Sequence, residues 1–258
     1  MLLRLMYNYP AYVWVRWFFW GNATILLGPL IAHMWRRGLH SRFPVFFGFL
    51  IWSVLRFFVA FYLHTSHYYV AFFEFHFYAD ALESLLLLFV AHELCNRLFA
   101  NFDGLRSLSR LLFRWGTGVM ILIAVAVAAT RNHTDLDPEL NALTSLDTAS
   151  KFLIAGMVFL LFLISSYFGM AWPRYSQAIA AGIALYMSVG IIDHTSFSLL
   201  GKVAGPTMVM VDNAAYFCSC LIWVVYLRAS ERTVTPPSRA PKHNLDKWNA
   251  TLQELLAR

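Results

Sequence analysis

Seven long apolar stretches constrain the fold of this chain more than any other feature of its sequence. A helix needs about 20 mostly apolar residues to cross about 30 Å of hydrocarbon. In lipid the backbone must satisfy its own polar groups, so such stretches are expected to be helical. They cover residues 11–34, 43–64, 76–96, 114–131, 149–171, 177–200 and 207–228, with several residues of uncertainty at each end. We therefore predict an all-α polytopic membrane protein, a bundle of seven transmembrane helices.

The composition supports lipid as the solvent of this chain. Of the 258 residues, 59% are hydrophobic and 13% are charged, against about 45–50% and 25% in soluble domains. The net charge of +6 is spread between apolar stretches instead of forming one patch, which excludes a nucleic-acid partner. The three cysteines, Cys95, Cys218 and Cys220, fall in no predicted outer loop, so we expect no disulfide.

The basic residues predict the orientation in the membrane. Most of the 20 Lys and Arg residues fall in the linkers after the first, third and fifth stretches and in the tail. The alternate linkers and the N-terminal segment hold only Arg4, Arg131 and Lys202. By the positive-inside rule the C-terminus is then cytoplasmic, and seven spans place the N-terminus outside. We expect a transmembrane domain over residues 1–230 and a cytoplasmic tail over 231–258.

Two segments have amphipathic patterns outside the spans. Residues 97–114 alternate leucines and phenylalanines with arginines, which predicts an interfacial helix on the anionic inner leaflet. In the tail, Asn244 is a potential helix cap, and apolar residues from Leu245 to Leu255 share one face. That second face is expected to contact either the membrane or a partner protein.

Charged residues inside the spans are the most informative positions, because a charge in the bilayer costs several kcal/mol unless it faces a partner in the bundle. Arg56 and Glu83 fall at similar depth on two neighbouring antiparallel spans, so we predict an ion pair between them. Asp80 and His76 precede Glu83 at spacings of one helical turn. His76, Asp80 and Glu83 then lie on one face of their helix.

Further polar residues come from the last two spans. Asp193 and His194 lie in the sixth stretch, and Asp212, Asn213 and Tyr216 lie in the seventh. Gly182, Tyr186, Gly190 and Asp193 form one stripe, whose small residues permit close helix packing. Lys151 follows Asp147 by four residues, which predicts a simple ion pair at the membrane interface.

The predicted cluster has more acids than bases. Arg16 and Arg56 face Asp80, Glu83, Asp193 and Asp212, so a proton, a metal ion or a cationic ligand would have to balance the surplus. A purely structural polar clasp between helices is the alternative. The ligand-binding residues that we predict are Arg56, Glu83, Asp80, Asp193, Asp212, His76, His194, Asn213 and Tyr216.

Cofactors are only partly constrained. His64, His67 and His76 are the candidates for a transition metal at the outer ends of the spans. His92 with His33 would be the ligands of a haem, which we do not favour. The last span has no lysine, so retinal is not expected, and no phosphate loop or nucleophile elbow is present.

One set of local motifs carries a family resemblance. Ser41-Arg42-Phe43-Pro44 leads into the second stretch, an aromatic run from Tyr68 to Tyr78 precedes Ala81-Leu82-Glu83, and Leu112-Phe113-Arg114-Trp115 opens the fourth stretch. This pattern, over residues 41–115, resembles bacterial seven-helix integral membrane proteins without an established activity. The resemblance implies a bacterial inner-membrane setting and nothing about chemistry.

Three hypotheses for function follow. The first is a non-enzymatic sensor or receptor-like component that binds a small molecule or ion from the outer side and signals to a separate partner. The second is a scaffold or accessory subunit of a larger membrane complex, with the polar cluster as a clasp. The third is a membrane enzyme or a proton-coupled carrier that uses the buried carboxylates.

Overall fold

The computed structural model describes residues 10–99, 118, 122, 138–167, 172–200 and 205–229, with some side chains inside these ranges left out. These residues are helical apart from short turns, and no strand occurs among them. The long helices are α2 (Pro10–Arg36), α4 (Pro44–Thr65), α5 (Tyr69–Leu98), α7 (Pro138–Tyr167), α8 (Arg174–Leu200) and α9 (Gly205–Arg228), and a short helix, α3 (Leu39–Arg42), joins α2 to α4.

Prolines and one glycine explain where several helices begin and end. Pro44 and Pro138 are the first residues of α4 and α7, and Pro206 is the second residue of α9. Proline suits these positions because its fixed φ is helical and its missing N–H would have no partner there. Gly38 has a φ of 68° just after α2, a left-handed conformation that glycine adopts without strain. Pro29 lies inside α2, which continues through it.

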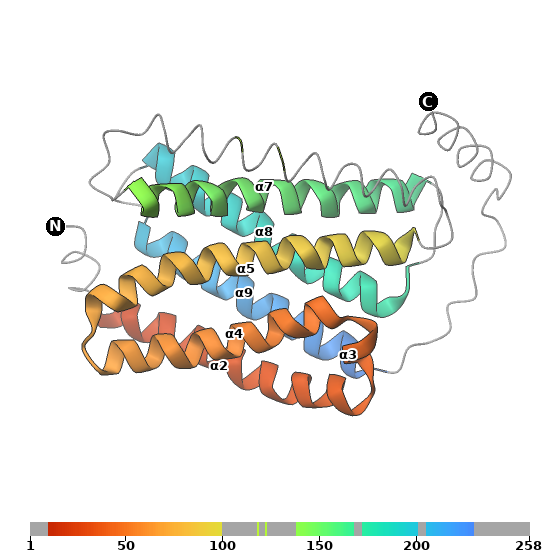
Figure 1. Cartoon of the computed structure of the whole chain (residues 1–258), viewed down its shortest axis with the longest axis horizontal. Coiled ribbons are helices and arrows are strands. Elements are labelled where there is room, and N and C mark those ends of the chain that lie inside the picture. Colours follow the sequence, from red (N-terminus) through yellow and green to blue (C-terminus); the bar gives the residue numbers. More distant parts are fainter. Residues whose placement is uncertain are drawn as a thin grey trace, which may run out of the picture.

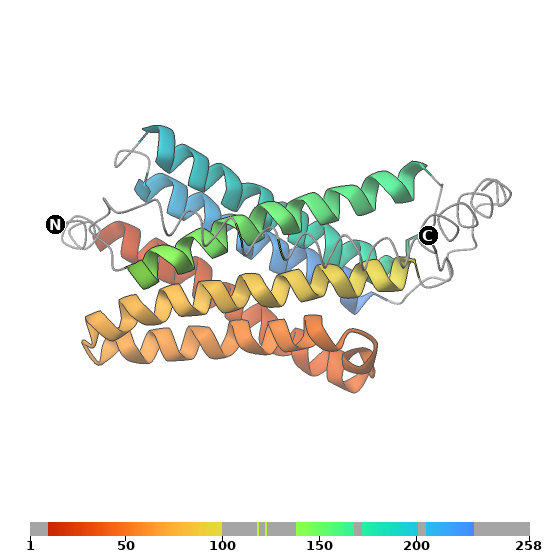
Figure 2. The same cartoon turned by 45° about the horizontal axis from the view of Figure 1, so that its top comes forward.

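The long helices close into a ring in chain order. Each packs on the next, from α2 to α4, α5, α7, α8 and α9, and α9 returns to α2. Figures 1 and 2 show that α2, α5, α7 and α9 run in one direction and α4 and α8 in the other. The arginines at or near the helix ends therefore gather at one end of the ring, which we call the basic end: Arg36, Arg37, Arg42, Arg97, Arg174 and Arg228.

Four helical segments are long and apolar enough to cross a membrane: Pro44–Thr65, Asp147–Ser166, Arg174–Ile192 and Met210–Arg228. Large apolar side chains on the outside of the ring, such as Ile25 (70% exposed) and Phe159 (64% exposed), suit contact with lipid. The chain is thus an all-helical protein whose apolar helices fit a bilayer.

Several helix bounds differ from the predicted stretches. α5 begins at Tyr69 instead of 76, and α7 begins at Pro138 instead of 149. For α7 the reason is that hydropathy marks only the apolar part of a helix, whereas backbone hydrogen bonding extends over the more polar residues 138–148. The residues added to α5, 69–75, are mostly aromatic and continue the same helix. The fourth stretch, 114–131, lies outside the described residues except for Gly118 and Leu122, which are helical. The predicted helices over 100–114 and in the tail also lie outside them.

The core is made largely of aromatic and branched side chains between α2, α4, α5, α7, α8 and α9. Phe46 and Phe49 of α4 are fully buried against Trp223 of α9, with ring centroids 5.2 and 5.8 Å from it. Both contacts are edge-to-face, the geometry that aromatic quadrupoles favour. We call these three residues the aromatic layer.

Close packing of α8 on α9 depends on Gly182. A Cβ at this position would collide with the indole of Trp223, and Ser219 Oγ donates a hydrogen bond to the Gly182 carbonyl oxygen at 2.9 Å. The predicted close approach of this glycine stripe is therefore confirmed at Gly182.

The first prediction concerns this contact. Gly182→Ala should lower the free energy of unfolding by about 1–3 kcal/mol, because the indole has to move inside a packed core. Thermal unfolding in detergent measures the change. Gly156→Ala is the control, since no atom lies within 4 Å of its Cβ position. An equal loss in both variants would mean that the Trp223 contact is not the cause.

Candidate functional site

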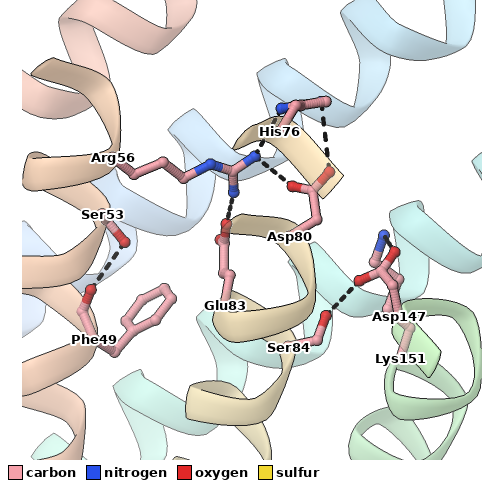
Figure 3. A network of polar contacts seen from close by, with 9 residues as sticks. All are labelled: Phe49, Ser53, Arg56, His76, Asp80, Glu83, Ser84, Asp147 and Lys151. Atoms are coloured by element: carbon pink, nitrogen blue, oxygen red, sulfur yellow. Dashed lines mark hydrogen bonds and ion pairs between the residues drawn. The ribbon is translucent and has the colours of Figure 1, made fainter. Parts of the chain in front are cut away.

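Arg56 of α4 is the centre of a polar cluster inside the ring. Its guanidinium donates hydrogen bonds to Glu83 and to Asp80 of α5, and both contacts are ion pairs. Arg56 and Glu83 are buried, whereas the Asp80 side chain is 33% exposed. Figure 3 shows the guanidinium pointing from α4 between the two carboxylates. The predicted ion pair between Arg56 and Glu83 is confirmed.

His76 continues this cluster away from the basic end. Its Nδ1 lies 3.3 Å from an Arg56 nitrogen, and its Nε2 lies 3.4 Å from Asp80 Oδ2. His76, Asp80 and Glu83 therefore share one face of α5, as their spacing predicts. Glu83 lies near the middle of α5, so the cluster reaches from mid-bundle toward the end where α5 begins.

A second part of the cluster comes from α7. Ser84, next to Glu83, donates a hydrogen bond to Asp147, and Lys151 Nζ lies 2.8 Å from Asp147 Oδ2. Asp147 is 8% exposed. The expected pair between Asp147 and Lys151 is confirmed, and Asp147 is the first residue of the candidate membrane span Asp147–Ser166. Because α7 begins at Pro138, both residues lie well inside the helix and face the ring interior.

Residues of α8 and α9 close the cluster. A Cβ on Gly190 would lie 3.5 Å from Lys151 Cδ and 3.7 Å from Asp212 Oδ1. The side chains of Lys151 and Asp212 therefore both pack against α8 at Gly190. The Tyr186 and Tyr216 rings contact each other with centroids 5.2 Å apart. Both tyrosines interact electrostatically with Arg56.

A small pocket joins the two parts. It is lined by Asp80, Glu83, Ser84, Leu87, Asp147, Lys151, Tyr186 and Met187. The pocket has room for about one water molecule. An organic ligand would not fit without movement of the helices, whereas a proton, a water molecule or a small cation would.

The charges of this cluster do not balance. Among the described side chains, the bases Arg56 and Lys151 stand against Asp80, Glu83, Asp147 and Asp212. We call these six residues, with Ser84, Tyr186 and Tyr216, the polar centre. Within this described set, four ionised carboxylates would exceed the two cations by two charges, and a low-dielectric bundle then needs a further positive group to balance them.

On the basic side, the polar centre meets the aromatic layer. Phe49 precedes Arg56 by two helical turns, and beyond it Phe46 N–H donates a hydrogen bond to Glu93 Oε2 at 3.2 Å. Glu93, on α5, thus lies on the other side of the aromatic layer from Glu83. Within the described part of the chain, buried carboxylates lie on both sides of this layer.

The remaining predicted residues include some whose side chains the structure does not describe. The side chains of Arg16, Asp193 and His194 are outside the described part, although these residues lie in α2 and α8. Asn213 is half-buried on α9 beside Asp212. His64 packs against Trp17 and Phe72, and His67 is exposed in the turn after α4. Within the described residues, no group of three His, Cys, Asp or Glu side chains fits a metal ion.

The prediction from sequence missed Ser84, Asp147 and Lys151 as members of the site. Asp147 and Lys151 have i, i+4 spacing, which describes a solvent-exposed helical pair as well as a buried one. The signal that could have found them is the start of the helix at Pro138, because this start places both residues more than two turns inside α7. Ser84 gave no signal of its own.

Removing the central cation should be strongly destabilising. Arg56→Met leaves the Glu83 carboxylate buried without its counter-charge, so the free energy of unfolding should fall by about 3–5 kcal/mol. Thermal or denaturant unfolding in micelles measures it. Arg36→Met, at the exposed end of α2, should change it by less than about 0.5 kcal/mol. The double variant Arg56→Met/Glu83→Gln should recover part of the lost free energy of unfolding. If it recovers none, the ion pair between Arg56 and Glu83 is contradicted.

Comparisons with known proteins leave this geometry as the basis for function. No protein-family model matches the chain, and neither the curated proteins nor the solved structures contain a significant match.

Proposed function

We propose that this chain is a seven-span protein of a bacterial inner membrane, which binds protons or a small cation from the outer side in the polar centre. In this proposal it acts as a sensor or receptor-like component. The observation that carries the proposal is that four carboxylates and two bases of the described chain gather near a pocket of water size, which Asp80, Glu83, Asp147 and Lys151 line.

The directions of α5 and α7 support one more crossing of the membrane by the chain that connects them. These helices run in the same direction (Figures 1 and 2), so α5 ends at the basic end and α7 begins at the opposite end. If both span the bilayer, the chain between Leu98 and Pro138 has to cross it once. Its sequence contains the apolar stretch 114–131, which is long enough to do so.

The basic end supports the proposed orientation. Arginines near membrane helix ends favour the cytoplasmic side, and the described chain carries six of them at the basic end. Because α9 ends there, the C-terminal tail starts in the cytoplasm. Seven crossings then put the N-terminus outside, with the partly exposed Asp80 and His76 on the outer side of Glu83.

The size of the pocket favours a proton or a small cation over an organic ligand. A cationic charge relieves the two surplus negative charges, whereas an anion would add to them. The absence of a three-ligand metal group among the described side chains makes a tightly held transition metal a poorer fit. Protons or a monovalent cation match both the space and the charge.

The aromatic layer favours a receptor over an open channel. Phe46, Phe49 and Trp223 have no exposed surface and separate the polar centre from Glu93. An ion in the polar centre would therefore exchange with one side of the membrane only in this conformation. Occupancy would act on the bundle through α5, α7 and α9, which share the carboxylates.

A proton-coupled carrier is the second candidate, because α5 has carboxylates on both sides of the aromatic layer. Glu83 faces the outer side of this layer, and Glu93 lies on the basic side. A carrier would have to move Phe46 or Trp223 during its cycle to connect the two.

The receptor proposal predicts stabilisation by its ion. Wild-type protein should gain melting temperature either as Na⁺ replaces N-methyl-D-glucamine at fixed ionic strength and pH, or as the pH falls from 8 to 6 without Na⁺. The first result identifies a cation and the second identifies protons, because binding to the native state alone stabilises it. Asp212→Asn removes one surplus charge and should reduce either shift by at least about half.

Glu74→Gln, at an exposed position of α5 outside the polar centre, is the control and should retain the wild-type shift. Arg56→Met adds one more surplus negative charge, so the shift should persist or grow wherever this variant still folds. A melting temperature that depends on neither Na⁺ nor pH would reject the ion-binding proposal and favour a structural clasp.

The carrier alternative predicts transport. Liposomes that contain the protein and a trapped pH dye should acidify faster than empty liposomes under an imposed pH gradient, and Glu93→Gln should abolish the difference. Folding of Glu93→Gln is checked by its melting temperature. Equal rates with and without protein support the one-sided receptor instead.

A further inference from the structure

Two arginines flank one buried ring at the basic end. The guanidinium carbons of Arg42, from α3, and Arg97, from α5, lie 5.7 and 4.5 Å from the centroid of the Phe43 ring. Arg42 also lies 5.9 Å from the centroid of Tyr175, from α8. Phe43 and Tyr175 are almost fully buried. Planar guanidinium groups on fixed rings keep a defined position, which an ordinary surface arginine does not.

Arg97 is only partly satisfied by protein groups. Its ion pair with Glu93 spans 3.7 Å, which is too long for a hydrogen bond. Glu93 instead accepts the N–H of Phe46 at the start of α4. The Nε atom of Arg97 is buried and has no hydrogen-bond partner among the described residues. The Nε atom itself is enclosed, but the Arg97 side chain is 32% exposed, so an acceptor from outside would meet the accessible part of this incompletely paired guanidinium.

The surrounding charge is positive. Arg36, Arg37, Arg174 and Arg228 lie at the same end of the bundle. Glu93 is the only carboxylate at this end within the described part of the chain. The acceptor that fits is therefore anionic and comes from outside the described chain.

We propose that Arg42 and Arg97, held by Phe43 and Tyr175, form a binding site for the headgroup phosphate of an anionic phospholipid. A phosphodiester offers the paired oxygens that guanidinium groups bind in a planar fork. The site lies at the ends of apolar helices, where headgroup phosphates concentrate, and the positive surplus selects an anionic lipid over a zwitterionic one. The site is separate from the polar centre and independent of its function.

Native mass spectrometry of delipidated protein tests this site. The probes are phosphatidylglycerol and phosphatidylcholine, titrated separately in detergent. Wild-type protein should bind one phosphatidylglycerol more tightly than any further copy. In the double variant R42Q/R97Q this first affinity should fall by about tenfold to thirtyfold, the effect of two arginines at a membrane surface. R36Q/R37Q removes two exposed arginines at the same end. It changes only the diffuse attraction, which salt screens, so its loss should be smaller than that of R42Q/R97Q.

A charge-preserving variant keeps the test decisive even if R42Q/R97Q does not fold. R42K/R97K keeps both charges but loses the planar fork, so a built site predicts a clear loss of the first phosphatidylglycerol. Equal affinity of R42K/R97K and wild type, or equal losses in R42Q/R97Q and R36Q/R37Q, would overturn the proposal in favour of diffuse surface attraction. Displacement of the lipid by millimolar inorganic phosphate would overturn it in favour of a soluble phosphate ligand.

Discussion

The buried guanidinium of Arg56 is the interaction on which the interior of this protein depends. It joins α4 to two carboxylates of α5 at a depth where neither charge could remain alone. Since α5 also contacts α7 through Ser84 and Asp147, the pair links three helices of the ring. The remaining polar residues of the centre are arranged around this link.

The apolar packing of the ring complements the polar centre. Trp223 fills the space that Gly182 leaves on α8 and meets two phenylalanines of α4. These contacts fill the bundle interior on the basic side of Arg56. Charged side chains among membrane helices are tolerated when they face the bundle interior and pair with one another, and such packing keeps lipid away from them.

The two ends of the bundle have different electrostatic roles. The basic end carries arginines on aromatic rings, with Glu93 as the described carboxylate between them. Among the described side chains, the middle and opposite half carry more carboxylates than cations. This separation suits a protein whose one end contacts anionic headgroups and whose interior holds a positive species from the other side.

The sequence alone determined the helical class, the fit to a membrane and the meeting of Arg56 with Glu83, Asp80 and His76. These follow from apolar length, from helical spacing and from the high cost of an unpaired charge in lipid, all of which are local properties. Only the tertiary structure decided that Asp147 and Lys151 belong to the polar centre. The spacing i, i+4 is the same sequence pattern for a pair at an interface and for a pair in a core. Tertiary structure also decided that α5 and α7 are neighbours with the same direction, that Glu93 caps α4, and that the aromatic layer divides the interior. Such facts depend on which helix faces which, and packing between distant segments decides that.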